Sequence, residues 1–193
     1  MKRIVAILLA LAVVFPAHAK DKDSKNEFSI TYGQVTVPQF AYVMGGVFGA
    51  AFTLGHFTFD NSLMFGAAGL EYVHYVNGWL GLGGAVTCDY MMSDAYSVDS
   101  EGNKSPNGKY RFGYASAMPV VKFAWFNRDR VGLYSKLAIG AGLVFDNGDK
   151  NSVTWAGQIT PIGFDFGGPS FRGFIEAGVG MQGIVNAGVR WLF

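Results

Sequence analysis

The feature that most constrains the fold is the C-terminal stretch 183–193, Gly-Ile-Val-Asn-Ala-Gly-Val-Arg-Trp-Leu-Phe. With a period of two, it separates into an apolar face and a polar or small face: Val185, Ala187, Val189, Trp191 and Phe193 against Asn186, Gly188 and Arg190. Successive side chains of a strand point to opposite faces, so the pattern predicts a strand between two different surroundings. The Trp-Leu-Phe ending would place aromatic side chains at a membrane boundary. A closing strand of this kind requires the rest of the chain to supply a closed sheet.

The N-terminal segment has the pattern of a secretory signal peptide. Lys2 and Arg3 precede an apolar run from Ile4 to Phe15, and residues 17–19, Ala-His-Ala, form a small-x-small cleavage site. The apolar run is shorter than the roughly 20 residues that a membrane-spanning helix needs. We therefore predict a signal peptide at 1–19 and a single outer-membrane β-barrel domain at 20–193.

Composition narrows the class of protein further. The chain has 27 Gly, 17 Phe and 9 Tyr, and no helix-length apolar run after residue 55, which argues against a soluble helical core. Removing Lys2 and Arg3 from the 15 basic residues leaves 13 against 14 acidic ones, so the exported chain lacks the basic excess that nucleic-acid binding needs. The lone Cys88 excludes a disulfide framework.

Segments of alternating polarity recur along the chain and are separated by turn-forming residues. They predict strands at about 27–34, 63–76, 79–92, 110–126, 131–145, 153–166, 171–182 and 183–193. Asn77-Gly78, residues 127–130 and residues 167–170 predict short turns, and the polar stretches 93–109 and 146–152 predict exposed loops. Pro119 predicts a bulge in its strand. The sequence thus predicts an all-β fold, an eight-stranded antiparallel transmembrane up-and-down β-barrel with its short turns in the periplasm.

Residues 38–55 depart from the period of two. This uncharged segment has apolar side chains three and four positions apart, which predicts a short helix in the first extracellular loop. Gly45 and Gly46 weaken a helix, so two short strands, giving ten in total, are the alternative. The apolar side chains are candidate contacts for an apolar ligand: Phe40, Met44, Phe48 and Phe52.

Charged residues assign the inner face of the predicted strands. Four acids and four bases fall on it, namely Glu27, Glu71, Asp89, Lys122, Lys136, Arg172, Glu176 and Arg190. An eight-stranded barrel is only wide enough for side chains to fill, and buried charges must be paired. We therefore predict a structural salt-bridge network in the lumen, with Arg190, Glu176 and Glu27 clustered in its periplasmic half. A gated or narrow pore lined by the same charges is the alternative.

Three short stretches carry a family resemblance: Phe-Ser-Ile-Thr-Tyr-Gly at 28–33, Gly-Phe-Ile-Glu-Ala-Gly at 173–178 and Gly-Val-Arg-Trp-Leu-Phe at 188–193. With them, the chain from Glu27 to Phe193 resembles small bacterial outer-membrane β-barrel proteins of the OmpA/OmpX-like type, and among these the Bacteroidetes barrels. The resemblance implies a monomer in the outer membrane of a Gram-negative bacterium, surrounded by outer-membrane lipid and lipopolysaccharide. It also implies that the barrel-assembly machinery is a partner during biogenesis, with Val189, Trp191 and Phe193 as the C-terminal assembly signal.

Function is less constrained than architecture, because one fold serves many functions. The leading hypothesis is a structural, surface-exposed barrel with a closed lumen, whose loops, 93–109 above all, contact extracellular ligands. Passage or capture of small hydrophobic molecules is the alternative, prompted by 38–55. An outer-leaflet lipid-modifying enzyme is the least favoured, because the exported chain has only His56 and His74 and neither lies in a Ser–His pattern. No catalytic residue, metal site or cofactor motif is assigned, and we expect no enzymatic activity.

Overall fold

The computed structural model describes residues 25–52, 57–99, 101, 103–146 and 151–193; the predicted signal peptide lies outside them. The described residues form one helix and nine strands. The elements are β1 (Asn26–Gln34), α2 (Val37–Phe52), β2 (Phe57–Met64), β3 (Ala67–Tyr75), β4 (Leu80–Val98), β5 (Lys104–Asn127), β6 (Val131–Asp146), β7 (Ser152–Gly167), β8 (Phe171–Gly180) and β9 (Val185–Leu192).

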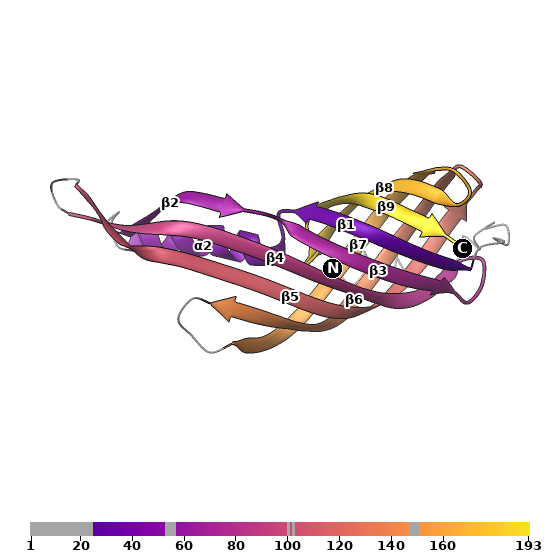
Figure 1. Cartoon of the computed structure of the whole chain (residues 1–193), viewed down its shortest axis with the longest axis horizontal. Helices are drawn as coiled ribbons and strands as arrows, with labels where there is room; N and C mark the ends of the chain where they lie inside the picture. The colour runs from indigo at the N-terminus through magenta and orange to yellow at the C-terminus, as the bar shows by residue number, and fades with distance from the viewer. Residues whose placement is uncertain (1–24, 53–56, 100, 102, 147–150) are drawn as a thin grey trace, which may run out of the picture.

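Eight of these strands close into an antiparallel barrel (Figure 1). Each barrel strand pairs with the next one along the chain, and β9 returns to pair with β1, with Trp191 opposite Phe28. The strand β2 pairs only with β4 and lies outside this ring. The predicted all-β, eight-stranded up-and-down barrel is therefore confirmed.

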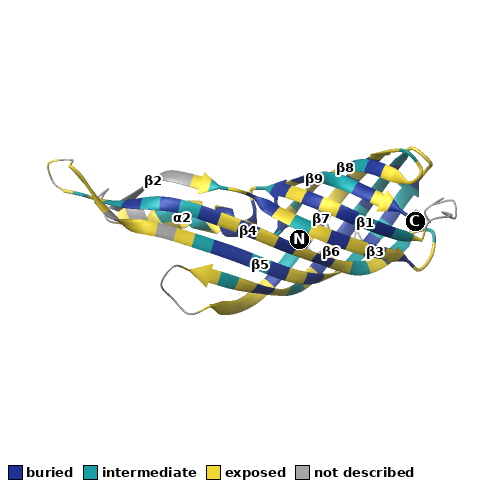
Figure 2. Cartoon of the chain, in the orientation of Figure 1, coloured by how far each residue is buried: buried dark blue, intermediate teal, exposed yellow. Residues whose placement is uncertain are grey.

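Alternation between buried and exposed side chains runs along the barrel strands, as Figure 2 shows. In β3, for example, Glu71, Val73 and Tyr75 are buried, whereas Tyr72 and His74 between them are exposed. The interior also has an apolar part, in which Met118 and Tyr114 pack with Val120 and Ala138. The barrel is thus filled with side chains, as expected for eight strands.

The helix α2 begins in a capping box. The Gln39 N–H donates to Thr36 Oγ1 (3.2 Å), and the Thr36 N–H donates to Gln39 Oε1 (3.1 Å), so the two residues satisfy each other's backbone donors. Pro38 stands in the first turn, where its missing N–H costs nothing. The predicted short helix is confirmed over Val37–Phe52, and the alternative of two short strands is wrong for these residues; residues 53–55 of the predicted segment lie outside the described residues.

Beyond one end of the barrel, at the left in Figure 1, β4 and β5 continue as a hairpin that carries β2 on one edge and α2 on one side. We call β2, residues 91–98 and residues 104–111 the arm. The prediction of a loop at 93–109 is wrong over most of its length, because the two strands stay paired up to Val98 opposite Lys104. Local polarity suggested a loop, but Ser93 and Ala95 continue the buried side of β4.

Two further predictions about the strands need correction. The strand predicted at 63–76 is split into β2 and β3, because Gly66 adopts a left-handed backbone (φ 82°). The bulge predicted at Pro119 is absent, since Pro119 pairs with Gly84 in an unbroken register. The register of β5 with β6 shifts instead between Ala124 and Phe126, and that of β7 with β8 shifts around Pro161.

Candidate functional site: the charge cluster of the lumen

The predicted inward charges are all buried. The exposed fraction of each of the eight residues is 5% or less, and Arg190 and Lys136 are completely enclosed at 0%. They come from every barrel strand except β7, so the strand order of the closed barrel brings together residues that are far apart in sequence. The structure adds one more buried carboxylate, that of Asp165 on β7.

Lys136 lies at the centre of the cluster. Its Nζ is 2.8 Å from Glu71 Oε2 and 2.8 Å from Glu176 Oε2. Asn186 donates to the same Glu176 oxygen (2.9 Å). One cation is therefore shared by carboxylates from β3 and β8, on opposite sides of the closing strands β1 and β9.

Arg190 is the second centre, nearer the end of the barrel that carries the short turns, which is the end predicted to face the periplasm. Its Nη1 lies 3.2 Å from Asp165 Oδ2 and 3.6 Å from Glu27 Oε2, and its Nη2 lies 3.8 Å from Glu176 Oε1. Glu27 is also paired with Lys122 Nζ at 2.5 Å. The structure therefore brings Arg190, Glu176 and Glu27 into one cluster.

Tyr134 connects the two centres. Its hydroxyl donates to Glu176 Oε1 (2.7 Å) and accepts from Arg190 Nη2 (2.7 Å). Lys122 Nζ lies 4.0 Å from the ring centroid and Arg190 Cζ lies 4.7 Å from it, both within cation–π range. Gly163 makes room for this ring, because a Cβ there would lie 2.4 Å from it.

Arg172 ties the cluster to the turns at the same end. Its Nη1 donates to Asp165 Oδ1 (2.6 Å) and to Asn127 Oδ1 (3.0 Å). Its Nη2 and Nε donate to the carbonyl oxygens of Arg128 and Gly168, in the turns that join β5 to β6 and β7 to β8. The guanidinium thus holds two turns against the end of the lumen.

Asp89 is the exception among the predicted residues, because it lies away from the charge cluster. Its two carboxylate oxygens accept hydrogen bonds from Thr36 Oγ1 (2.5 Å) and Gln39 Nε2 (3.2 Å), at the start of α2. Asp165 takes its place in the balance of the cluster, which pairs four acids with four bases in the described lumen: Glu27, Glu71, Asp165 and Glu176 with Lys122, Lys136, Arg172 and Arg190.

Asp165 was missed because the period of two breaks within its strand. Gln158 and Thr160 point inward, and an uninterrupted strand would then turn Asp165 outward. The register shift at Pro161 adds one residue and restores an inward direction to Gly163 and Asp165. Proline inside a predicted strand was the available signal, and we placed its effect at Pro119 instead.

The acids and bases of this cluster neutralise one another's buried charges. Each carboxylate faces at least one cation within 4 Å, and the cations are fully buried. Such pairing offsets desolvation, which for an isolated buried ion costs several kcal/mol. Among the residues that the structure describes, no group of three or more His, Cys, Asp or Glu side chains could hold a metal ion.

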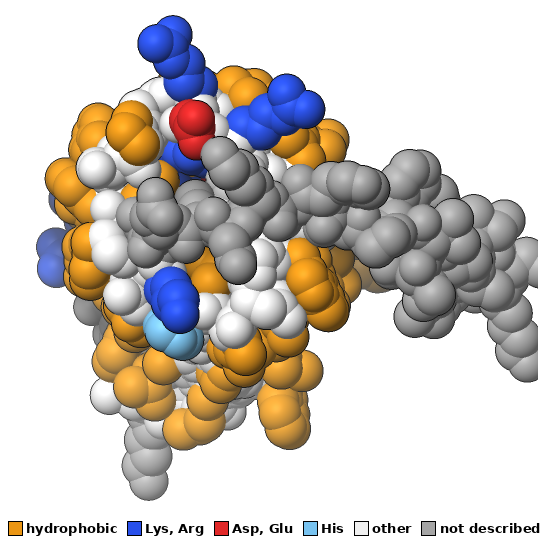
Figure 3. Space-filling model, turned by 90° about the vertical axis from the view of Figure 1, so that its right-hand side faces the viewer, with side chains coloured by type: hydrophobic (Ala, Val, Ile, Leu, Met, Phe, Trp, Pro, Cys, Tyr) orange, Lys and Arg blue, Asp and Glu red, His pale blue; other side chains and the backbone are white. Residues whose placement is uncertain are grey.

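The outward faces of the barrel have the opposite character. In β1, β3, β6, β7, β8 and β9, apart from Asp146 at the end of β6, no Asp, Glu, Lys or Arg points outward in the described strands. Figure 3 shows the end with the short turns, where hydrophobic side chains cover the flanks and charged ones stand at the end. Within the described chain, no helix has the length and apolar character needed to cross a membrane.

Aromatic side chains mark this end of the outward surface. Trp191 packs edge-on against Phe171 (ring centroids 5.2 Å apart) and lies 6.4 Å from Phe28, while Trp79 stacks on Phe123 (6.2 Å). The residues of the predicted assembly signal belong to this surface: Val189, Trp191 and Phe193.

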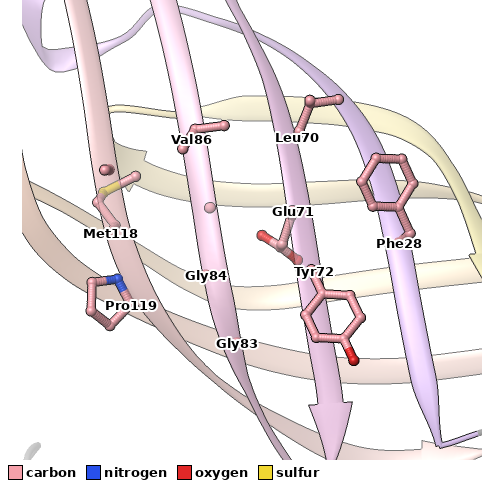
Figure 4. Close-up of a pocket in the computed structure, with 11 residues that line it drawn as sticks. Phe28, Leu70, Glu71, Tyr72, Gly83, Gly84, Val86, Met118 and Pro119 are labelled. Carbon is pink, nitrogen blue, oxygen red and sulfur yellow. The ribbon is translucent and has the colours of Figure 1, made fainter.

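A shallow groove of about 450 Å³ indents the outer wall over β1, β3, β4 and β5 (Figure 4). Gly83, Gly84 and Ala117 line it where larger side chains would fill the space, and Phe28, Tyr72 and Pro119 are among its walls. Glu71, the one charged lining residue, is buried and bonded to Lys136. The groove therefore offers apolar surface and no reactive group.

The apolar residues predicted as ligand contacts lie on the exposed side of α2. The exposed fractions are 58% for Phe40, 54% for Phe48 and 87% for Phe52, whereas Met44 is half-buried. No charged residue interrupts this helix. The residues thus form an uncharged apolar surface that projects from the barrel beside the arm.

The chain was also compared with known proteins. No protein-family model and no curated protein sequence matches it.

Proposed function

We propose that the chain is an integral outer-membrane β-barrel of a Gram-negative bacterium, similar to the OmpA/OmpX-like barrels, with a closed lumen and a surface-exposed arm. Its role is structural, and the arm is the part that contacts extracellular ligands. The barrel is a monomer that the barrel-assembly machinery inserts among outer-membrane lipid and lipopolysaccharide. It catalyses no reaction.

The observation that carries the proposal is the contrast between the two faces of one sheet. Inside the barrel the charged side chains are buried and paired, whereas the outward side chains of the barrel wall are mostly apolar; the exposed charges of β4, β5 and β6 lie in the arm or at the strand end, as at Asp146. A sheet with water on both faces would have no reason to keep charges on one face only. A bilayer, in contrast, excludes unpaired charges from the outward face of the barrel. The lengths of β1 (9 residues), β3 (9) and β8 (10) agree with the roughly 9–11 residues of a tilted membrane-crossing strand.

The closed lumen follows from the same cluster. Lys136 and Arg190, both fully enclosed, link carboxylates from four different strands across the interior. Ions that entered the lumen would have to separate these pairs, at several kcal/mol for each charge left alone. This favours a lumen that is blocked by the charge cluster, which we call the plug, over an open pore.

The test combines location with conductance. Folded protein should fractionate with the outer membrane, show heat-modifiable mobility on gels, and be cleaved at the arm by protease added to intact cells. In planar bilayers it should give no unitary conductance. A reproducible single-channel conductance of the folded form would contradict the closed lumen and support a pore. Recovery of the protein in the soluble periplasmic fraction would contradict the outer-membrane location.

The exposed apolar surface of α2 favours a second candidate, capture of small hydrophobic molecules. Phe40, Phe48 and Phe52 form an exposed and uncharged surface on one side of α2. Exposed apolar surfaces of this kind usually mark a site of interaction. An environment-sensitive naphthylamine dye added to the barrel in nanodiscs should then bind in a saturable way, and Phe48→Asp should abolish this binding. Equal dye binding by the variant would remove this candidate.

A further inference from the structure

The first turn of α2 occupies the open end of the barrel. Thr36, Pro38 and Gln39 are buried, whereas Phe48 and Phe52 further along the helix are exposed. In Figure 1 the helix starts at the barrel and runs outward beside the arm. The N-terminal turn is therefore seated in the mouth, and the rest of the helix extends beyond it.

Asp89 is the barrel-wall group that receives this turn. The capping box leaves one donor on each side chain, the Thr36 hydroxyl and the Gln39 amide. Each of these donors reaches a different oxygen of the Asp89 carboxylate, and all three residues are at least 95% buried. A negative charge at the N-terminus of a helix also interacts favourably with the helix dipole.

The helix itself is weak, so contacts with the rest of the protein hold it in place; these are its packing against β2 and the seat of its first turn. Gly45 and Gly46 lower its intrinsic stability, and a Cβ at Gly45 would stand in open space, so packing does not demand a glycine there. The chain enters the helix through Val35, a β-branched residue held in a left-handed backbone (φ 58°). The two glycines and the left-handed backbone at Val35 do not by themselves hold the first turn against the barrel, whereas the hydrogen bonds to Asp89 do.

Buried hydroxyl groups lie below the seat. On β4, Thr87 is the next inward residue beneath Asp89, and its hydroxyl is 2.6 Å from that of Ser116 on β5. Ala85, the next inward residue, is paired with Glu71, which belongs to the charge cluster. Along β4, the order from the mouth inward is thus Asp89 in the seat, Thr87 with its hydroxyl, and Ala85 beside the charge cluster, within an interior that side chains fill.

We propose that α2 is a lid on the mouth of the barrel and that Asp89 is the latch that keeps it closed over the buried hydroxyl groups of Thr87 and Ser116. A carboxylate offers an acceptor to both donors of the capping box. An amide at the same position would be neutral and would accept from only one of the two donors, and its N–H₂ would have to donate to Thr36 Oγ1, which already accepts from the Gln39 N–H. Asp89→Asn should therefore loosen the first turn in its seat and expose the buried residues directly below it, Thr87 first, to water-soluble molecules.

The test measures access to residue 87, which is buried directly below the seat. In a Cys88→Ala background, Thr87→Cys supplies a single buried thiol directly below the seat, and a membrane-impermeant maleimide added to the folded barrel reports its accessibility. Labelling should be at least tenfold faster after Asp89→Asn. Asp94→Asn makes the same chemical change on β4 outside the capping contacts and should leave the rate unchanged.

A second variant separates release of the lid from loss of the fold. Thr36→Val removes one donor to Asp89 while keeping side-chain shape, and it should also accelerate labelling. Rates are compared on the heat-modifiable, folded fraction only. Unchanged labelling in both variants, or acceleration confined to unfolded protein, would overturn the latch. Opening the lid alone should not let ions pass, because the charge cluster lies further inside the lumen and still blocks it. Ion conductance by Asp89→Asn would therefore contradict the closed lumen proposed above.

Discussion

Replacement of Arg190 by alanine tests the lumen cluster most directly. The guanidinium donates to Asp165 Oδ2 (3.2 Å) and to the Tyr134 hydroxyl (2.7 Å), and it lies over the Phe174 ring (4.3 Å). Each hydrogen bond from a charged group contributes about 1.5–3 kcal/mol, and a buried cation–π contact adds about 0.5–2 kcal/mol. Together with the unbalanced negative charge, Arg190→Ala should lower the free energy of unfolding by about 3–5 kcal/mol.

The measurement is urea unfolding of the barrel refolded in phospholipid vesicles, followed by tryptophan fluorescence and by heat-modifiable mobility. Arg130→Ala is the matched control, because Arg130 is exposed in a turn and should cost no more than about 0.5 kcal/mol. Arg190→Lys keeps the charge but loses the planar fork, so its cost should fall between those of the control and Arg190→Ala.

A double substitution tests whether the loss comes from the charge balance. Adding Asp165→Asn to Arg190→Ala returns the cluster to equal numbers of acids and bases, so the two losses should be less than additive by at least about 0.5 kcal/mol. The reasoning is refuted if Arg190→Ala costs less than about 1 kcal/mol, which is the range of an exposed ion pair.

Three further predictions concern assembly, phase and the helix. Deletion of Phe193 should reduce the amount of folded barrel in the outer membrane at equal synthesis, and undiminished folded protein would exclude it from the assembly signal. Deletion of Pro161 removes the extra residue of β7, and plain alternation from Thr160 then keeps Gly163 and Asp165 inward, so the heat-modifiable form should be retained; its loss would contradict the reading of the bulge as one added residue in the alternation. Gly45→Ala should stabilise α2 by up to about 1 kcal/mol, which slows amide hydrogen exchange in the helix about fivefold; faster exchange would show that the glycine is required there.

Local periodicity was sufficient to predict the barrel. The period of two in 183–193 and in 131–145 depends only on the alternation of side chains within a strand, so it is visible without knowledge of the partner strand. Charge then identified the inner face, because an unpaired charge on the outward face would be costly. The helix was likewise predictable from its uncharged 3- and 4-residue spacing, although its capping box at Thr36 and Gln39 was overlooked.

The tertiary structure decided the features that depend on partners distant in sequence. Ser93 and Ala95 are strand residues because β5 and β2 pair with them, although their surroundings in the sequence are those of a loop. Asp89 serves the helix rather than the charge cluster because α2 enters the mouth above it.

Asp165 is the clearest case of this division. Its sequence neighbours Phe164 and Phe166 show correctly that the strand alternates there, but not which side faces the lumen. That choice was made by the register shift at Pro161, which appears only when β6 and β8 pair with β7. A sequence records the period of a strand directly, whereas its phase across a bulge is set by hydrogen bonds to neighbouring strands.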